Sequence, residues 1–243
     1  MRGEVDVLNS LAAIEIDSGE AKIALEHAQK ALEIAEEIDY PSGVSHPHHM
    51  LGVSWGHLGE YELAWKHLDT ALWLNSRIGK PSSSLLPNID ELAIRQGNYE
   101  KAKAYVDEGF KLAEEAKDQW NMGAALGTRG WIALRQGELE QAKRLLGESL
   151  GVRQKIGDKG GIAWCLEKLA EIASIQGLPE KAARILGTAS SLRQTSSSPI
   201  NSADQPEYDR LLESVWESIG QERFQAAWGA GSMMPLETRT SND

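Results

Sequence analysis

The chain has 243 residues, of which 41% are hydrophobic, enough for a sizeable core. Its formal net charge of −11 argues against a nucleic-acid partner, because an acidic surface repels phosphate. Cys165 is the one cysteine, which excludes an intramolecular disulfide and suits a reducing compartment. No apolar run approaches the roughly 20 residues of a membrane helix, and the N-terminus lacks a secretory signal. We therefore expect a cytoplasmic protein without membrane contact.

A glycine recurs along the chain with spacings of 38 or 40 residues, and an alanine follows each one five residues later. The glycines are Gly19, Gly59, Gly97, Gly137 and Gly177. The alanines are Ala24, Ala64, Ala102, Ala142 and Ala182. Because the amino-acid sequence around these positions also repeats, we interpret the chain as one repeating unit that occurs five times.

Each unit reads as a hairpin of two helices. The residues before the glycine have helical apolar spacing, for example Leu166, Leu169 and Ile172. Glycine then ends this first helix, since it enters the left-handed conformation without a steric penalty. The alanine lets the second helix approach closely, and small residues within the first helix serve the same crossing at Ala12, Gly52, Gly130 and Ala170. The pattern predicts an all-α fold.

The second unit resembles the tetratricopeptide repeat, whose pattern is W-x₂-L-G-x₂-Y followed by a turn glycine and A-x₃-F-x₂-A. The matching residues are Leu51, Gly52, Trp55, Gly59, Ala64, Leu68 and Ala71. The resemblance implies a right-handed α-solenoid of about five hairpins. The period near 40 is similar to that of MalT-like members of this family. Armadillo and HEAT units have a similar length but lack the glycine-then-alanine register.

The third unit is irregular, because Pro81, Pro87 and Asp90 stand where the other units have helix formers or a small residue. Pro87 cannot donate a backbone hydrogen bond, so we expect a short first helix that starts near it. The irregularity is either a tolerated feature of the surface or a hinge or specialised binding notch.

The sequence divides into a repeat domain at 1–193, a loop at 194–206, capping helices at 207–230 and a flexible tail at 231–243. The polar, turn-rich text of the loop supports its assignment. One capping helix should start near Pro206, a favoured first-turn proline, and another should cover 222–228, so that both shield the last hairpin. No such cap is visible before the first hairpin, which suggests a piece of a longer protein.

Residues 137–231 resemble the C-terminal region of bacterial STAND-type regulators. The signature is IGDKGGIAWCLEKLA, then QGLPEKAARILGTAS, then F-x₂-A-W-x₂-G, which here comprises Phe224, Ala227, Trp228 and Gly231. Such proteins join a P-loop ATPase to tetratricopeptide-like repeats and often to a LuxR-type DNA-binding domain. The segment from Gly79 to Ser82 lacks the spacing of a Walker A motif. The resemblance therefore implies the regulatory or sensor arm of such a protein.

The first helices of tetratricopeptide hairpins line a concave ligand-binding surface, and the register predicts which residues face it. The predicted groove residues are His49, Val53, His57, Glu91, Arg95, Trp131, Arg135, Trp164 and Glu167, with His46 and Glu171 beside them. Tryptophan and arginine are the usual anchors of protein interfaces. The competing interpretation is that Trp131 and Trp164 fill gaps between helices and that Arg95 and Arg135 offset helix dipoles.

Two observations concern chemistry in the groove. His46 and His49 could share a helical face and hold a metal, but no nearby cysteine completes a ligand set, so we predict no metal. No nucleophile, acid–base or metalloprotease motif occurs, so we predict neither an enzyme nor a cofactor.

We expect a module that binds a protein, a peptide or another domain of its parent. The alternative is a sensor whose groove closes on a small inducer.

Overall fold

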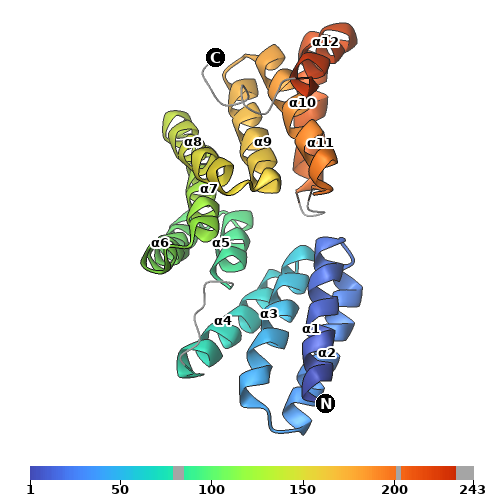
Figure 1. Ribbon diagram of the computed structural model, residues 1–243, viewed down its shortest axis with the longest axis vertical. Helices are drawn as coiled ribbons and strands as arrows, with labels where there is room; N and C mark the ends of the chain where they lie inside the picture. Colours follow the sequence, from blue (N-terminus) through green and yellow to red (C-terminus); the bar gives the residue numbers. More distant parts are fainter. Residues whose placement is uncertain (79–84, 201–203, 234–243) are drawn as a thin grey trace. The chain divides into compact units, whose positions relative to one another are not determined.

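The computed structural model describes residues 1–78, 85–200 and 204–233, and within these ranges the chain forms twelve α-helices and no strand. The helices, labelled in Figure 1, are α1 (Arg2–Asp17), α2 (Ala21–Glu37), α3 (Pro41–His57), α4 (Tyr61–Ile78), α5 (Leu86–Arg95), α6 (Tyr99–Ala116), α7 (Gln119–Arg135), α8 (Leu139–Ile156), α9 (Lys159–Ile175), α10 (Pro179–Ser196), α11 (Gln205–Ile219) and α12 (Gln221–Ser232). The predicted all-α class is confirmed. No helix in the described ranges has the length and apolarity needed to span a membrane.

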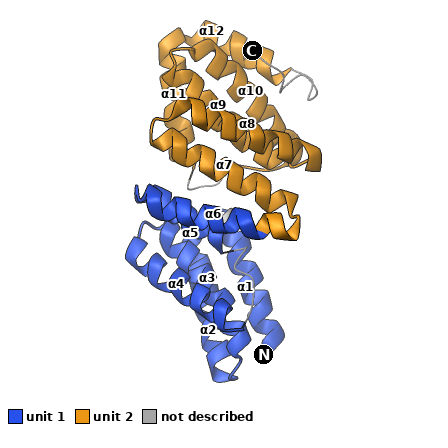
Figure 2. Ribbon diagram, turned by 90° about the vertical axis from the view of Figure 1, so that its left-hand side faces the viewer, with its two compact units in different colours: residues 1–112, 201–203 blue, residues 113–200, 204–243 orange. Residues whose placement is uncertain are grey.

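The described residues group into two compact units, drawn in different colours in Figure 2. Unit 1 comprises residues 1–112, with α1 to α5 and most of α6, and unit 2 comprises residues 113–200 and 204–233. Within unit 1, α2 packs between α1 and α3, and α4 packs on α3. Within unit 2, α8 packs between α7 and α9, and α10 packs on α9.

The predicted turn glycines end the first helix of every hairpin. All five have φ between +72° and +83°, the left-handed conformation. At Gly137 the backbone N–H groups of Gly137 and Glu138 donate to the carbonyls of Leu134 and Ala133, at 3.0 and 2.9 Å. This pair of bonds satisfies the terminal carbonyls of α7 and reverses the chain. The prediction of hairpins with glycine turns is confirmed.

Small residues hold the two helices of a hairpin together, as the register predicts. The five alanines that follow the turn glycines are fully buried. A Cβ at Gly52 would lie 2.6 Å from Leu68 Cγ, and one at Gly130 would lie 2.8 Å from Leu146 Cγ. A larger side chain at either glycine would therefore separate the helices.

The third hairpin has the expected short first helix, since α5 has 10 residues whereas α3, α7 and α9 each have 17. It begins at Leu86, beside the predicted Pro87. Asp90 takes the position that Gly52 and Gly130 hold in other hairpins, and it is only 4% exposed. The hinge hypothesis rests on the segment with Pro81, and residues 79–84 lie outside the described residues.

Two helices follow the fifth hairpin and pack on it. Val215 of α11 is fully buried in a cluster with Ala182 and Leu186 of α10, and Phe224 and Trp228 of α12 join the same cluster. Helix α10 continues to Ser196, past the expected repeat boundary at 193, and α12 continues to Ser232, past the expected end at 230. Of the expected tail, residues 234–243 lie outside the described part of the chain.

Candidate binding sites

The predicted groove residues lie on the first helices of four hairpins and form two sets, one in each unit. His49, Val53 and His57 are on α3, and Glu91 and Arg95 are on α5, all in unit 1. Trp131 and Arg135 are on α7, and Trp164 and Glu167 are on α9, all in unit 2. Each set is described within its own unit.

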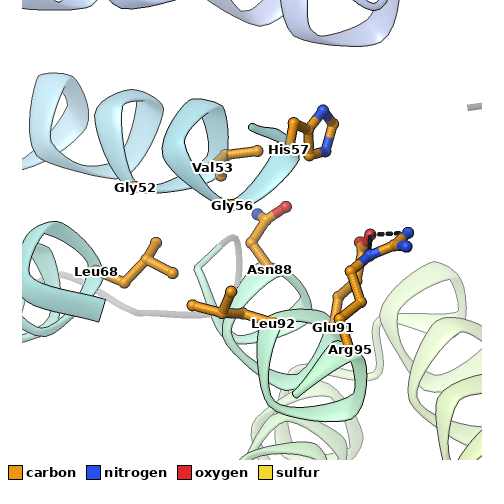
Figure 3. A pocket seen from close by; sticks show the side chains of 9 residues that line it. All are labelled: Gly52, Val53, Gly56, His57, Leu68, Asn88, Glu91, Leu92 and Arg95. Carbon is orange, nitrogen blue, oxygen red and sulfur yellow. Dashed lines mark hydrogen bonds and ion pairs between the residues drawn. The ribbon is translucent and has the colours of Figure 1, made fainter. Parts of the chain in front are cut away.

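In unit 1, four of the predicted residues line one shallow pocket between α3 and α5 (Figure 3). They are Val53, His57, Glu91 and Arg95, and the side chain of Asn88 also lines the pocket from α5. Arg95 donates from Nε and Nη2 to Glu91 Oε1, at 2.9 and 2.7 Å. This pair is half-buried and spans one helical turn, so it fixes two side chains at the rim of the pocket.

The histidines of unit 1 have structural partners. His49 is buried, and its Nε2 lies 2.8 Å from Asn88 Nδ2, which links α3 to α5. The Nδ1 atoms of His48 and His67 lie 2.9 Å apart, and burial lowers the pKa of His67 to about 4, with His48 and then Lys66 contributing. In the described ranges no group of three or more His, Cys, Asp or Glu side chains is placed to hold a metal.

In unit 2, the two predicted tryptophans contact one another. The ring centroids of Trp131 and Trp164 are 6.1 Å apart with an interplanar angle of 87°, an edge-to-face arrangement. Lys168 Nζ lies 5.1 Å from the Trp131 centroid and 5.7 Å from the Trp164 centroid. The Arg135 guanidinium lies 5.9 Å from the Trp131 ring. Two cations thus lie against two aromatic faces, the geometry of cation–π attraction.

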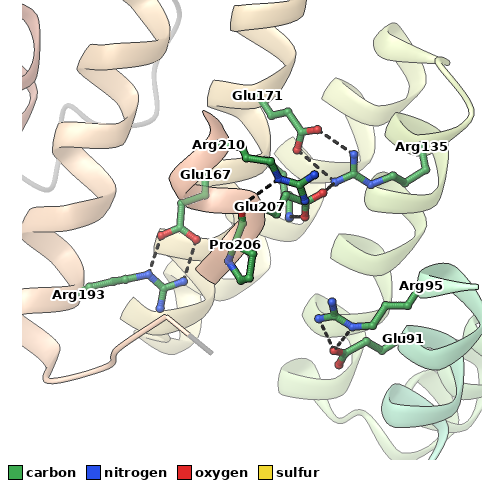
Figure 4. A network of polar contacts seen from close by, with 10 residues as sticks. Glu91, Arg95, Arg135, Glu167, Glu171, Arg193, Pro206, Glu207 and Arg210 are labelled. Atoms are coloured by element: carbon green, nitrogen blue, oxygen red, sulfur yellow. Dashed lines mark hydrogen bonds and ion pairs between the residues drawn. The ribbon is translucent and has the colours of Figure 1, made fainter. Parts of the chain in front are cut away.

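A carboxylate from the last part of the chain enters this cluster (Figure 4). Glu207, in the first turn of α11, pairs with Arg135, and its Oε2 accepts from Lys168 Nζ at 2.9 Å. Arg135 also donates to Glu171 at 2.9 Å. Burial acts to raise the pKa of Glu207, but the positive charges of Lys168 and Arg135 outweigh it and hold that pKa below its usual value.

Glu167 serves a neighbouring contact. It is buried and accepts two hydrogen bonds from Arg193 of α10, at 2.6 and 2.8 Å. The Nη1 of Arg193 also donates to the carbonyls of Ser198 and Pro199, at 3.2 and 3.0 Å. This pair therefore holds the chain segment that leads toward α11, and it makes Glu167 a positioning residue.

Sequence reasoning missed Lys168 and Glu207. Lys168 stands at the same position of its repeat as Asn88, nine residues before the turn glycine. Asn88 lines the pocket of unit 1 and Lys168 lines the pocket of unit 2, so the alignment of the repeats could have indicated Lys168. Glu207 belongs to α11, outside the repeats, and no register places it. The resulting shallow pocket in unit 2 is lined by Trp164, Glu167, Lys168, Glu171, Ile200, Asp204, Glu207, Tyr208 and Leu211.

Comparison with known proteins agrees with this architecture. Residues 5–38 match the sequence model of the tetratricopeptide repeat. No curated protein matches the chain in sequence. Residues 5–38 are thus a tetratricopeptide repeat, and the chain has the fold of tetratricopeptide-repeat proteins.

Solved structures of this fold are similar to the chain at low sequence identity. BtubC from P. vanneervenii has a TM-score of 0.63 and 16% identity, with 81% of this chain and 82% of that chain covered. A STAND protein with a tetratricopeptide repeat sensor from Pyrococcus horikoshii has a TM-score of 0.63 and 16% identity, covering 93% of this chain and 35% of that one. PilF of Pseudomonas aeruginosa has a TM-score of 0.58 and 17% identity, covering 92% and 96%. These likenesses concern the fold.

Proposed function

We propose that the chain is a protein-interaction module and that the aromatic and cationic site of unit 2 binds a helix or peptide of its partner. The main support for this proposal is the position of Glu207, which is paired with Arg135 and Lys168. The side chains of Arg135 and Lys168, placed over Trp131 and Trp164, already hold a carboxylate at the start of a helix that is not part of the repeats. A partner segment whose acidic residue displaced Glu207 would meet the same two cations beside the partly buried Trp164.

The geometry favours a macromolecular partner over a small inducer. Trp131 is buried and Arg135 is already engaged by two carboxylates, so Trp131, Trp164 and Arg135 leave little room between them for a small inducer. A small ligand is usually enclosed on most of its surface. A peptide or helix instead gains affinity from an open surface with a few anchors.

The regulatory role of the module is part of the same proposal. The sequence of residues 137–231 resembles the repeat region of STAND-type regulators. The similar structure from Pyrococcus horikoshii is a STAND protein with a tetratricopeptide repeat sensor. We infer a cytoplasmic module that senses or scaffolds for a signalling or transcriptional regulator, without catalysis or direct binding of nucleic acid. We also propose that residues 1–193 form the repeat domain and that residues 207–230 cap it.

An affinity pull-down from the source cell tests the binding role. The double variant Arg135→Ala with Lys168→Ala should lose most of the partner that the parent chain recovers, because it removes both cations of the site. Arg144→Ala is the matched control, since Arg144 is an exposed arginine of α8 outside the site. Circular dichroism checks that the variants are folded. Equal partner recovery by the double variant and the control would contradict the proposal.

A further inference from the structure

The first two turns of α11 present three different chemical groups to the pocket of unit 2. Glu207, Tyr208 and Leu211 line this pocket together with Trp164 and Lys168 of α9. Leu211 follows Tyr208 by three residues and Glu207 by four, the spacings of neighbours on one helix face. A carboxylate, a phenol ring and a leucine side chain of α11 therefore meet the aromatic and cationic residues of the repeats.

Charge holds the start of α11 at this pocket. Glu207 pairs with Arg135, and its Oε2 accepts a hydrogen bond from Lys168 Nζ at 2.9 Å (Figure 4). The two cations also hold the pKa of Glu207 below its usual value, so its carboxylate is ionised at neutral pH. The contact is thus made by a charged group that another carboxylate can replace.

Packing holds the second half of α11 more firmly than the first. Val215 is fully buried against α10, whereas Glu207, Tyr208 and Leu211 are only partly buried. No side chain of α11 other than Val215 is buried. The first two turns can therefore leave the pocket for the loss of the ion pairs and of partial apolar contacts, while Val215 keeps the rest of the helix in place.

We propose, on the basis of the function proposed above, that the partner binds through a helical segment of the same pattern and that the start of α11 competes with it. The pattern is a glutamate in the first turn, an aromatic residue directly after it and a leucine four residues after it. The partner's helix dipole favours the acid in its first turn, as that of α11 does. Arg135 and Lys168 are both paired with Glu207, and two carboxylates held at the same cations would repel one another.

This competition regulates the site. The apparent affinity for the partner is reduced by the fraction of molecules in which Glu207 occupies the cations. Only a segment that reproduces the carboxylate and the two apolar contacts displaces α11. A second copy of the chain is a poorer occupant, because its own Tyr208 and Leu211 already pack in the cluster that α9 and α10 form with Val215.

A labelled peptide with the sequence of residues 204–214 tests the competition, with its binding to the full chain measured by fluorescence anisotropy. The peptide stops before Val215, so it does not replace the packing of α11 on α10. Glu207→Gln in the chain should tighten peptide binding by about tenfold, because the amide no longer neutralises the two cations. Glu213→Gln in the chain is the matched control and should leave the affinity unchanged, since Glu213 is an exposed carboxylate of α11 outside the first turn.

A peptide that itself carries Glu207→Gln should bind the chain much more weakly than the peptide with the glutamate. Equal affinity of the parent chain and its Glu207→Gln variant would overturn the proposed competition, and equal binding of the two peptides would overturn the proposed pattern. A dimer of the parent chain in light scattering that the peptide dissociates would assign the site to a second copy. Partner recovery that depends on Arg135 and Lys168, together with no binding of the peptide to any variant, would overturn this inference and leave the proposed function standing.

Discussion

At the residue scale, Asp90 is a carboxyl where other hairpins have a glycine or alanine at the helix crossing. Burial raises its pKa well above the ordinary value of 3.8, and the negative charge of Glu91 adds to this effect. The folded state therefore binds its proton more tightly than the unfolded state. Asp90 costs nothing at pH values below 3.8, where both states are protonated, and it lowers stability as the pH rises from there toward the folded-state pKa.

Asp90→Asn should remove this pH dependence, because the amide cannot ionise. At neutral pH the free energy of unfolding should rise by about 1–2 kcal/mol relative to the parent chain. Urea unfolding at pH 4 and pH 7 measures the difference. The parent chain should lose more stability between the two pH values than the variant does. Identical losses in both proteins would show that Asp90 is ionised in the folded state.

Replacement of two glycines of unit 2 by alanine should change the stability of the chain in opposite directions. Gly137 has φ +78°, so Gly137→Ala should destabilise the chain by about 1–2 kcal/mol through steric strain. Gly147 lies inside α8 with open space at its Cβ position, so Gly147→Ala should stabilise it by about 0.5–1 kcal/mol through reduced chain entropy. Thermal unfolding of both variants checks the pair. Shifts of the same sign would contradict the assigned backbone conformations.

At the element scale, α11 is held at its start by the charge of Glu207 and further along by the burial of Val215. Glu207 has a lowered pKa, so its contribution is present above the usual value of 4.5 and is lost as the pH falls through the folded-state pKa. The helix dipole also favours this carboxylate, which lies in the first turn of α11. The first turn of α11 should therefore open more readily as the pH falls and Glu207 loses its charge.

Glu207→Gln should speed hydrogen exchange of the first turn of α11 several-fold at neutral pH, because Arg135 and Lys168 lose their shared anion. Glu213→Gln is the control, since Glu213 is an exposed carboxylate of the same helix outside the first turn. It should leave the exchange of that turn unchanged. Equal acceleration in both variants would mean that helix propensity, and not the ion pairs, governs the opening.

The hairpins could be predicted from the sequence because their determinants are local. A glycine's left-handed φ and an alanine's small volume act within one turn and one crossing, so the register of Gly137 and Ala142 was enough. The charged partners could not be predicted in this way. The pairing of Glu207 with Lys168, and of Glu167 with Arg193, depends on where α10 and α11 pack, which no period in the sequence encodes.

At the scale of the whole molecule, the net charge of −11 makes the cations of the unit 2 site a local exception. Arg135 and Lys168 lie beside two tryptophans and are neutralised in the structure by carboxylates of the chain itself. A partner that binds there would exchange one carboxylate for another while adding contacts with the partly buried Trp164. The proposed function requires that this site be a protein-binding surface.

Photo-crosslinking in the source cell tests that claim most directly. A photoreactive amino acid replaces Asp204, which lines the unit 2 pocket, or Glu148, which is exposed on α8 away from it. We expect a protein adduct from position 204 that is absent at position 148 and is lost when Arg135 and Lys168 are replaced by alanine. Adducts of equal yield at both positions, or an adduct at 204 that survives the loss of both cations, would contradict it.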